Sequence, residues 1–192
     1  MPLTINDYFD KMQKRDFLRE MQYRVTVLSY GDISVTLDDL VYLKTGDIPS
    51  RTITQVPVPY MGLNFSVPGT VQYPGTMNLT FYCDQPQIIR STFEAMSFAA
   101  FDNRYSGGSY TVRPADQLIF QTFDNAGPEN ITTQYQLVGI YPTEVGAITM
   151  DTTGNGQTTT LTVTIAYQYW NKLTAPVQTR SASNVLVGTQ SP

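Results

Sequence analysis

The chain has 192 residues, of which 41 % are apolar and only 15 % charged, and its formal net charge is −4. This length fits one domain with arms, and the net negative charge argues against a basic nucleic-acid-binding surface. Histidine is absent, which removes the commonest general base and the commonest metal ligand. The single cysteine, Cys83, cannot form an internal disulfide, so we interpret it as a reduced, partly buried strand residue.

No motif for catalysis is present. The chain has neither a Ser/His/Asp triad nor a Cys–His pair, and no glycine-rich phosphate loop. Asp38-Asp39 could be a carboxylate pair for catalysis or calcium, but a solvated bend is the simpler interpretation, because adjacent strand residues point to opposite faces. We therefore expect no enzymatic activity, no cofactor and no metal site.

The N-terminal residues are polar and charged, with no apolar stretch of the signal-peptide kind. No segment approaches the roughly 20 apolar residues that span a bilayer. These patterns predict a protein that is made and kept in a soluble compartment.

In chain order, the first predicted element is a short amphipathic helix or arm within residues 4–20, because Ile5, Tyr8, Phe9 and Met12 follow helical spacing. Residues 21–30 read as a strand that ends at the hairpin signal Gly31-Asp32. Residues 33–43 read as a second strand with a bulge or bend at Asp38-Asp39.

An extended apolar segment follows a loop-like stretch at residues 44–52. Pro57 and Pro59 exclude a central strand there and favour an edge strand or an arm, because proline cannot donate to a ladder. Either the segment straps over its own core, or its apolar side chains contact a partner. These side chains are Ile53, Val56, Val58 and Met61. Pro68-Gly69 and Pro74-Gly75 are read as turns.

The clearest alternation and the clearest helix come next. In the strand Thr76–Cys83, Met77, Leu79 and Phe81 share one face. Residues 85–101 are predicted to form a helix that Asp84 caps and that tolerates Pro86 in its first turn. Its apolar stripe suits packing on a sheet and consists of Ile89, Phe93, Met96 and Ala100.

The second half of the chain reads as strands and turns. Strands are predicted at Leu118–Phe123, Ile131–Tyr141 and Thr158–Trp170, with a hairpin turn at Gly154-Asn155-Gly156. The pattern predicts a mainly β fold: an antiparallel β-sandwich or barrel with one flanking α-helix. The predicted organisation is an N-terminal arm or short helix at 1–20, a β-sandwich domain at 21–171 and a flexible tail at 172–192.

Charge is unevenly placed. Residues 114–171 contain no lysine or arginine, and they carry five acidic residues: Asp116, Asp124, Glu129, Glu144 and Asp151. This block is either simply a low-charge β segment or the wall of a channel along which DNA slides, because acidic or neutral surfaces repel phosphates. The Thr/Gln/Asn strand faces also lack the charges that usually guard sheet edges, so these edges could pair with another chain.

Two blocks resemble the tail tube proteins of contractile-tailed, T4-like bacteriophages. One runs from Gly139 through Tyr141, Pro142 and Gly146 to a final strand that ends in Tyr169-Trp170. The other joins 57–61, 64–69 and the strand 76–84 that leads into the helix. The resemblance covers about residues 15–171.

The resemblance implies a structural subunit of the phage tail tube. Six subunits form a ring whose inner sheets join into one continuous barrel, and rings stack into a hollow tube that conducts the genome into the host. It implies an extended inter-subunit arm at about 43–60, with contacts from Ile53, Val56, Pro57, Val58, Pro59, Tyr60 and Met61. It also implies a family-signature core of Tyr141, Pro142, Gly146, Tyr169 and Trp170.

The implied partners are the subunit itself, the tail sheath protein and a baseplate tube initiator. The lumen holds a tape-measure protein and double-stranded DNA without sequence-specific binding. The implied location is the phage tail of the virion, assembled in the host cytoplasm. The alternative readings are a tube-initiating baseplate ring protein, or the inner tube of a related contractile injection or type VI secretion system. A monomeric enzyme or ligand-binding β-sandwich is a further alternative, which the lack of histidine and of any catalytic motif disfavours.

Overall fold

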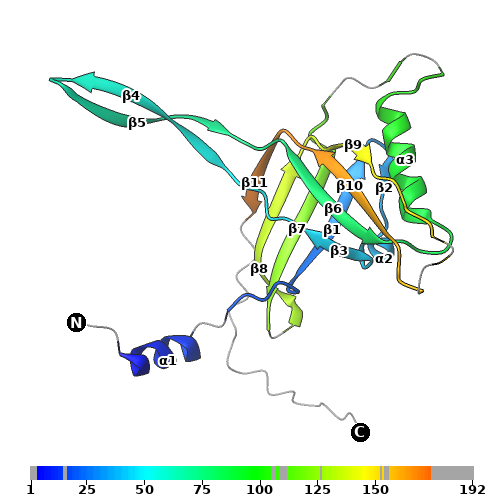
Figure 1. Cartoon of the computed structure of the whole chain (residues 1–192), viewed down its shortest axis with the longest axis horizontal. Coiled ribbons are helices and arrows are strands. Elements are labelled where there is room, and N and C mark those ends of the chain that lie inside the picture. Colours follow the sequence, from blue (N-terminus) through cyan, green and yellow to red (C-terminus); the bar gives the residue numbers. More distant parts are fainter. Residues whose placement is uncertain are drawn as a thin grey trace, which may run out of the picture.

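The structure is a computed structural model that describes residues 4–14, 17–104, 107–108, 112–125, 127–151, 153 and 156–173. Within these residues the fold is a sandwich of two antiparallel sheets, from which a long hairpin and an N-terminal helix project (Figure 1). The tail was predicted from residue 172, but Lys172 and Leu173 belong to a strand, Tyr169–Leu173. The rest of the predicted tail and most of the predicted turn Gly154-Asn155-Gly156 lie outside the described residues.

The larger sheet has five strands in the order β11-β8-β7-β1-β2. Their bounds are β1 Tyr23–Tyr30, β2 Ile33–Ser34, β7 Gln117–Asp124, β8 Gly127–Val138 and β11 Tyr169–Leu173. The predicted hairpin at Gly31-Asp32 is confirmed, because Ser29 pairs with Ser34 and Gly31 has a φ of +60°.

The smaller sheet has four strands in the order β3-β6-β10-β9. Their bounds are β3 Leu43–Gly46, β6 Thr76–Tyr82, β9 Tyr141–Val145 and β10 Thr160–Ala166. The inward side chains Met77, Leu79 and Phe81 are buried, as their alternation predicts. The two sheets enclose a single core together with the helix α3. The mainly β, antiparallel prediction is confirmed, and in the described chain the sandwich consists of two open sheets rather than a closed barrel.

Two predicted strands are each divided between the sheets. The strand predicted at 131–141 ends at Val138, and the chain crosses to the other sheet at Gly139, whose φ is +67°. The strand predicted at 158–170 breaks after Ala166 and continues in the opposite sheet from Tyr169. Where a chain passes from one sheet to the other, the strands before and after the crossing both alternate between core-facing and outward side chains. The period-2 pattern therefore continues across the crossing and does not show where it occurs.

The predicted strand 33–43 is wrong beyond Ser34. Residues Leu37–Leu40 form the short helix α2, which Thr36 caps by accepting a 3.3 Å hydrogen bond from the Asp39 N–H. Leu40 then enters the core. This local threonine cap outweighed the strand preference of the surrounding apolar residues.

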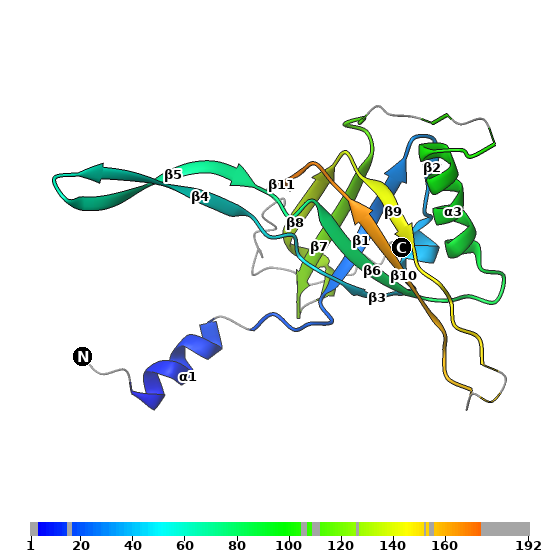
Figure 2. The same ribbon diagram turned by 45° about the horizontal axis from the view of Figure 1, so that its top comes forward.

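The predicted main helix is confirmed, with a later start. α3 spans Ile88–Ala100, and the Asp84 carboxylate accepts a 3.0 Å hydrogen bond from the Ile88 N–H. Gln87 adopts a φ of 55°, so Pro86 lies in a turn before the helix rather than in its first turn. Ile89, Phe93 and Met96 are buried. The helix α3 lies along the side of the sandwich, next to β2 and β9 (Figures 1 and 2).

The segment predicted as an arm forms a β-hairpin. β4 (Thr52–Tyr60) pairs with β5 (Leu63–Gln72), and both figures show it leaving the sandwich on the side away from α3. The turn predicted at Pro68-Gly69 is wrong, because both residues lie inside β5. The bounds also differ from the predicted 43–60, because residues 43–46 belong to the smaller sheet as β3.

The N-terminal helix α1 spans Ile5–Lys14, within the predicted region. At its start, the Thr4 N–H donates a hydrogen bond to the Asp7 carboxylate, and the Asp7 N–H donates one to the Thr4 hydroxyl. This reciprocal pair has the form of a capping box. Ile5, Tyr8 and Phe9 are exposed, and α1 lies apart from the sandwich in both views. No helix among the described residues is long and apolar enough to cross a membrane.

Candidate assembly surface

The projecting hairpin presents one apolar face and one face of prolines and polar residues. Cross-strand partners share a face of a β-ladder. On one face the partners are Val56 with Val67, Val58 with Phe65, and Tyr60 with Leu63. On the other face they are Gln55 with Pro68, Pro57 with Ser66, and Pro59 with Asn64.

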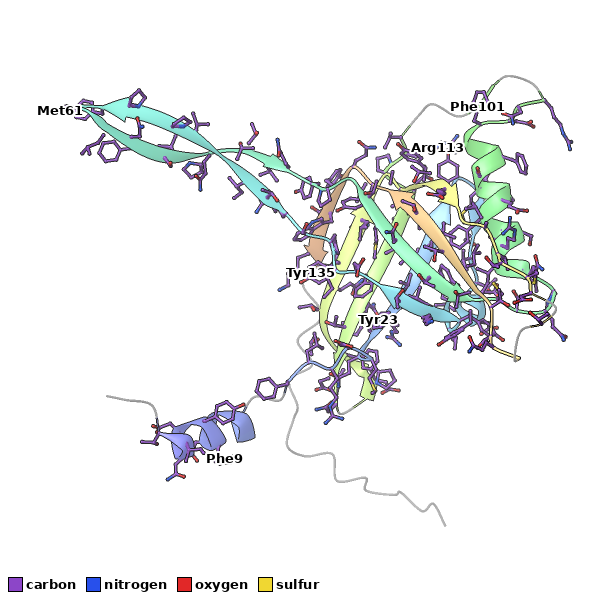
Figure 3. All side chains as sticks on the ribbon, viewed as in Figure 1. Phe9, Tyr23, Met61, Phe101, Arg113 and Tyr135 are labelled. Carbon is purple, nitrogen blue, oxygen red and sulfur yellow. The ribbon has the colours of Figure 1, made fainter. Side chains whose placement is uncertain are left out.

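The apolar face is not covered by the rest of the described chain. Its six side chains are between 42 % and 64 % exposed, and Figure 3 shows Met61 at the far tip. From Thr52 to Cys83 there is no charged residue, so neither strand carries the charges that usually protect an exposed edge. The face is therefore suited to burial against an uncharged partner surface.

The predicted arm contacts fall on both faces of this hairpin. Val56, Val58 and Tyr60 lie on the apolar face, whereas Pro57 and Pro59 lie on the opposite face. Leu63, Phe65 and Val67 complete the apolar face and were missed. Their alternation with Asn64, Ser66 and Pro68 is the period-2 signal that could have identified them.

The root of the hairpin is held by Trp170. Its indole N–H donates a 3.0 Å hydrogen bond to the Ser50 carbonyl, and its ring meets Tyr135 and Tyr73 edge-on at 5.4 and 6.2 Å between centroids. Farther out, Gly69 lies against Thr54, and a Cβ there would come within 2.6 Å of the threonine hydroxyl. Thr54 in turn accepts a 2.8 Å hydrogen bond from the Thr70 N–H. These contacts orient the hairpin where it leaves the sandwich.

The family-signature residues divide between core and surface. Pro142 is buried and Trp170 packs against the core, but Tyr141 and Tyr169 are 37 % and 41 % exposed, so they are not core residues. Gly146 lies directly on β10: its N–H donates a 2.8 Å hydrogen bond to the Thr162 carbonyl, and a Cβ would stand 2.5 Å from that oxygen.

The five acidic residues do not form one wall. Asp124 and Glu129 lie at the β7–β8 end of the larger sheet, whereas Glu144 lies on β9 in the smaller sheet. Asp151 lies in the loop that follows β9, where Thr153 donates two hydrogen bonds to its carboxylate and lowers its pKa. The sequence pattern counted charge along the chain and had no information about which sheet each residue would join.

Asp116 is a correction to the predicted channel wall. Its side chain is only 2 % exposed and accepts a 2.7 Å hydrogen bond from the Gly31 N–H. Its backbone carbonyl accepts hydrogen bonds from the N–H groups of Gly139 and Ile140. Asp116 therefore ties the β1–β2 turn to the β8–β9 crossing, and it is a structural residue.

The outward strand faces are polar and nearly uncharged. On the smaller sheet, the Thr80 and Thr162 hydroxyls lie 3.3 Å apart, and the Thr164 hydroxyl donates a 3.0 Å hydrogen bond to Asn78. On the larger sheet, the Gln136 amide donates to Gln117 at 2.5 Å. Within the predicted wall segment 114–171, strand β8 lies in the larger sheet and strand β10 in the smaller sheet, so one sheet cannot supply both strands to a channel wall.

A cavity of about 550 Å³ lies between the end of α3 and the β8–β9 crossing, lined in part by Phe101, Ile140 and Asp116. No cluster of metal-binding side chains occurs among the residues that the structure describes. Burial raises the pKa of the Cys83 thiol, which disfavours the reactive thiolate.

Comparison with known proteins points to one family. A family model described as phage tail tube protein matches residues 17–173. The tail tube protein gp19 of Enterobacteria phage T4 is 24 % identical over 170 residues, which cover 88 % of this chain and 99 % of that protein. The corresponding protein of Enterobacteria phage T6 matches to the same extent.

Solved structures share the fold at low sequence identity. A chain of the anti-feeding prophage baseplate superposes with a TM-score of 0.59 at 12 % identity, covering 83 % of this chain and 97 % of that chain. A chain of the extended sheath–tube complex of an extracellular contractile injection system gives 0.55 at 12 % identity, covering 86 % and 97 %.

Proposed function

The chain belongs to the family of phage tail tube proteins and is a structural component of the virion, and from this premise we propose that it forms hexameric rings that stack into a hollow tube. The tube stands inside a contractile sheath and conducts the genome, and the subunit has no catalytic role. The observation that carries the proposal is the projecting hairpin with its uncovered apolar face. In a monomer, the apolar face of this extension would stay exposed to water. In an assembly, a neighbouring subunit can cover it.

The strand faces support the conducting role. Uncharged threonine, asparagine and glutamine side chains hold DNA phosphates weakly, so a wall built from them lets a polyanion move. We propose that one of the two sheets supplies this wall, with Glu144 or the pair Asp124 and Glu129 as its acidic members. Double-stranded DNA and a tape-measure protein are the proposed contents, without sequence-specific binding.

The proposed partners outside the lumen are the sheath protein and a baseplate initiator of the tube. A structural neighbour belongs to a sheath–tube complex, which supports this assignment. An initiating baseplate ring is the alternative, since a baseplate chain shares the fold equally well.

Electron microscopy of the purified protein across a concentration series tests the proposal. Long hollow tubes with six-fold end views are expected. Single rings that do not elongate favour the initiator, and a strict monomer at high concentration contradicts both readings. A Glu144→Lys variant and a Glu129→Lys variant then locate the wall. The substitution on the lumen side should make tubes retain DNA at low salt, and the other should not.

A further inference from the structure

The cavity beside the end of α3 has an exposed apolar part and a buried polar part. Its volume of about 550 Å³ lies within the roughly 300–1,000 Å³ that is usual for small-molecule sites. The apolar and aromatic side chains Phe101, Val112 and Tyr141 line it and are exposed, and Figure 3 shows Phe101 where α3 ends. Tyr30 and Asp116 also line it, but both are more than nine-tenths buried. The cavity can therefore hold an apolar group that carries a polar or charged end.

Asp116 is a buried carboxylate that uses only part of its bonding capacity. Its Oδ1 atom accepts the 2.7 Å hydrogen bond from the Gly31 N–H. Among the residues that the structure describes, none donates a hydrogen bond to its Oδ2 atom, and the one ion pair joins Arg90 to Glu94. Two carboxylate oxygens offer about four acceptor positions, and buried charges in proteins are normally paired. A positively charged partner from outside the described chain would complete this carboxylate.

The neighbouring side chains do not supply that partner. Among the described residues that line the cavity, Asp116 alone is charged. Arg113 and Asp32 line a second cavity of about 220 Å³, which shares Tyr30 and Asp116 with the first. Arg113 forms no ion pair with Asp116 in the described part of the chain, and its charge is offset by that of Asp32. Burial raises the pKa of Tyr30, and the negative charge of Asp116 raises it further although Arg113 lowers it. The phenol therefore stays neutral, and the charge of Asp116 remains unbalanced.

We propose that the cavity binds an organic cation: a guanidinium, amidinium or primary ammonium group at Asp116, carried on a short apolar stem that packs against Phe101 and Tyr141. Such groups donate charge-assisted hydrogen bonds to a carboxylate, and aromatic rings attract them further. A metal ion would need several protein ligands, and no cluster of metal-binding side chains occurs in the described chain. All of these residues belong to one subunit, so the site exists without assembly of a tube.

Calorimetric titration of the unassembled, full-length protein with benzamidine tests the charge. Benzamidine should bind saturably, whereas benzamide, which has the same ring with a neutral carboxamide, should bind about tenfold more weakly or worse. Asp116→Asn keeps the shape of the side chain and removes its charge, so it should weaken benzamidine binding by about tenfold or more. Circular dichroism checks that the variant is folded. Equal affinities of benzamidine for the folded variant and for wild type would overturn the proposal.

Two exposed phenylalanines near the end of α3 provide a matched test that leaves Asp116 intact. Phe101 lines the cavity and Phe98 does not. Phe101→Ala should weaken benzamidine binding by about twofold to fivefold, whereas Phe98→Ala should leave it unchanged. Equal effects of these two variants would contradict the position of the stem, and they decide the matter even if Asp116→Asn does not fold. Arg113→Gln should change the affinity by less than about twofold. A large gain in affinity would show that Arg113 already pairs with Asp116, and the proposal would be wrong.

Benzamidine binding to assembled tubes distinguishes two sources of the natural cation. If the cation is a free small molecule, tubes should bind benzamidine as the unassembled subunit does. If a basic side chain of a neighbouring subunit fills the cavity, tubes should exclude benzamidine. Either result supports the site, whereas an absence of saturable binding to the unassembled protein overturns it. None of the binding measurements on the subunit depends on tube growth, so failure of this site leaves the proposed function standing.

Discussion

Substitution of Asp116 distinguishes a structural carboxylate from a channel-wall carboxylate. Asp116→Ala removes the acceptor of the 2.7 Å hydrogen bond from the Gly31 N–H at a side chain that is 2 % exposed. A hydrogen bond to a charged group contributes about 1.5–3 kcal/mol, so the free energy of unfolding should fall by about 2 kcal/mol. For a chain of this size, the midpoint of thermal unfolding should fall by roughly 4–8 °C. Asp116→Asn keeps an acceptor oxygen and should cost about half as much.

Urea and thermal unfolding of the unassembled protein, followed by circular dichroism, measure this loss. Glu129→Ala and Glu144→Ala are the matched controls, because both side chains are exposed and their removal should change stability by less than about 0.5 kcal/mol. If Asp116→Ala is as stable as these controls but alters DNA retention by the tubes, Asp116 belongs to the channel wall and the structural reasoning fails.

Three further substitutions or reactions probe the fold. Gly146→Ala should destabilise the protein by about 1–3 kcal/mol in urea unfolding, because the alanine Cβ would stand 2.5 Å from the Thr162 carbonyl oxygen. Ala147→Gly, at an exposed neighbour, is the control, and equal unfolding midpoints for the two variants would contradict the clash. Trp170→Phe should cost about 1 kcal/mol and speed amide exchange around Ser50, since the 3.0 Å indole hydrogen bond is lost; unchanged exchange there would show that Trp170 does not hold the hairpin root. Maleimide should label Cys83 slowly at pH 7–8 and faster as the pH rises past 9, because burial raises the pKa of the thiol above its ordinary value. If the folded protein is labelled at the same rate as the urea-unfolded chain, this prediction is wrong.

Local chemistry accounts for the predictions that were confirmed. Alternation of Met77, Leu79 and Phe81 predicted their burial, and the stripe of Ile89, Phe93 and Met96 predicted the packing of α3. Both patterns depend on residues two to four positions apart, so the chain segment itself contains the information. The start of α3 was predicted too early. Gln87 has a positive φ and forms a turn before the helix, and glutamine is not a residue type that indicates such a turn.

Of the two strands of the projecting hairpin, the sequence predicted only β4. Prolines 57 and 59 identified β4 as an edge element, but its partner β5 was divided by a turn predicted at Pro68-Gly69. In the structure Pro68 occupies a non-bonded position and Gly69 allows close approach to Thr54, so neither residue ends the strand. The two faces of the hairpin depend on register, which the turn at Met61-Gly62 determines.

The sequence by itself determined the mainly β character, the main helix and the uncharged, proline-marked segment, because each depends on composition or short periods along the chain. Only the tertiary structure decided where the chain changes sheet at Gly139 and after Ala166, and that Asp116 is buried while Glu144 is exposed. A crossing between sheets preserves the alternation of both strands, and burial of a carboxylate depends on partners such as Gly31 that lie 85 residues away in sequence. Contacts between residues so far apart in sequence depend on how the two sheets pack, and a local sequence pattern does not predict them.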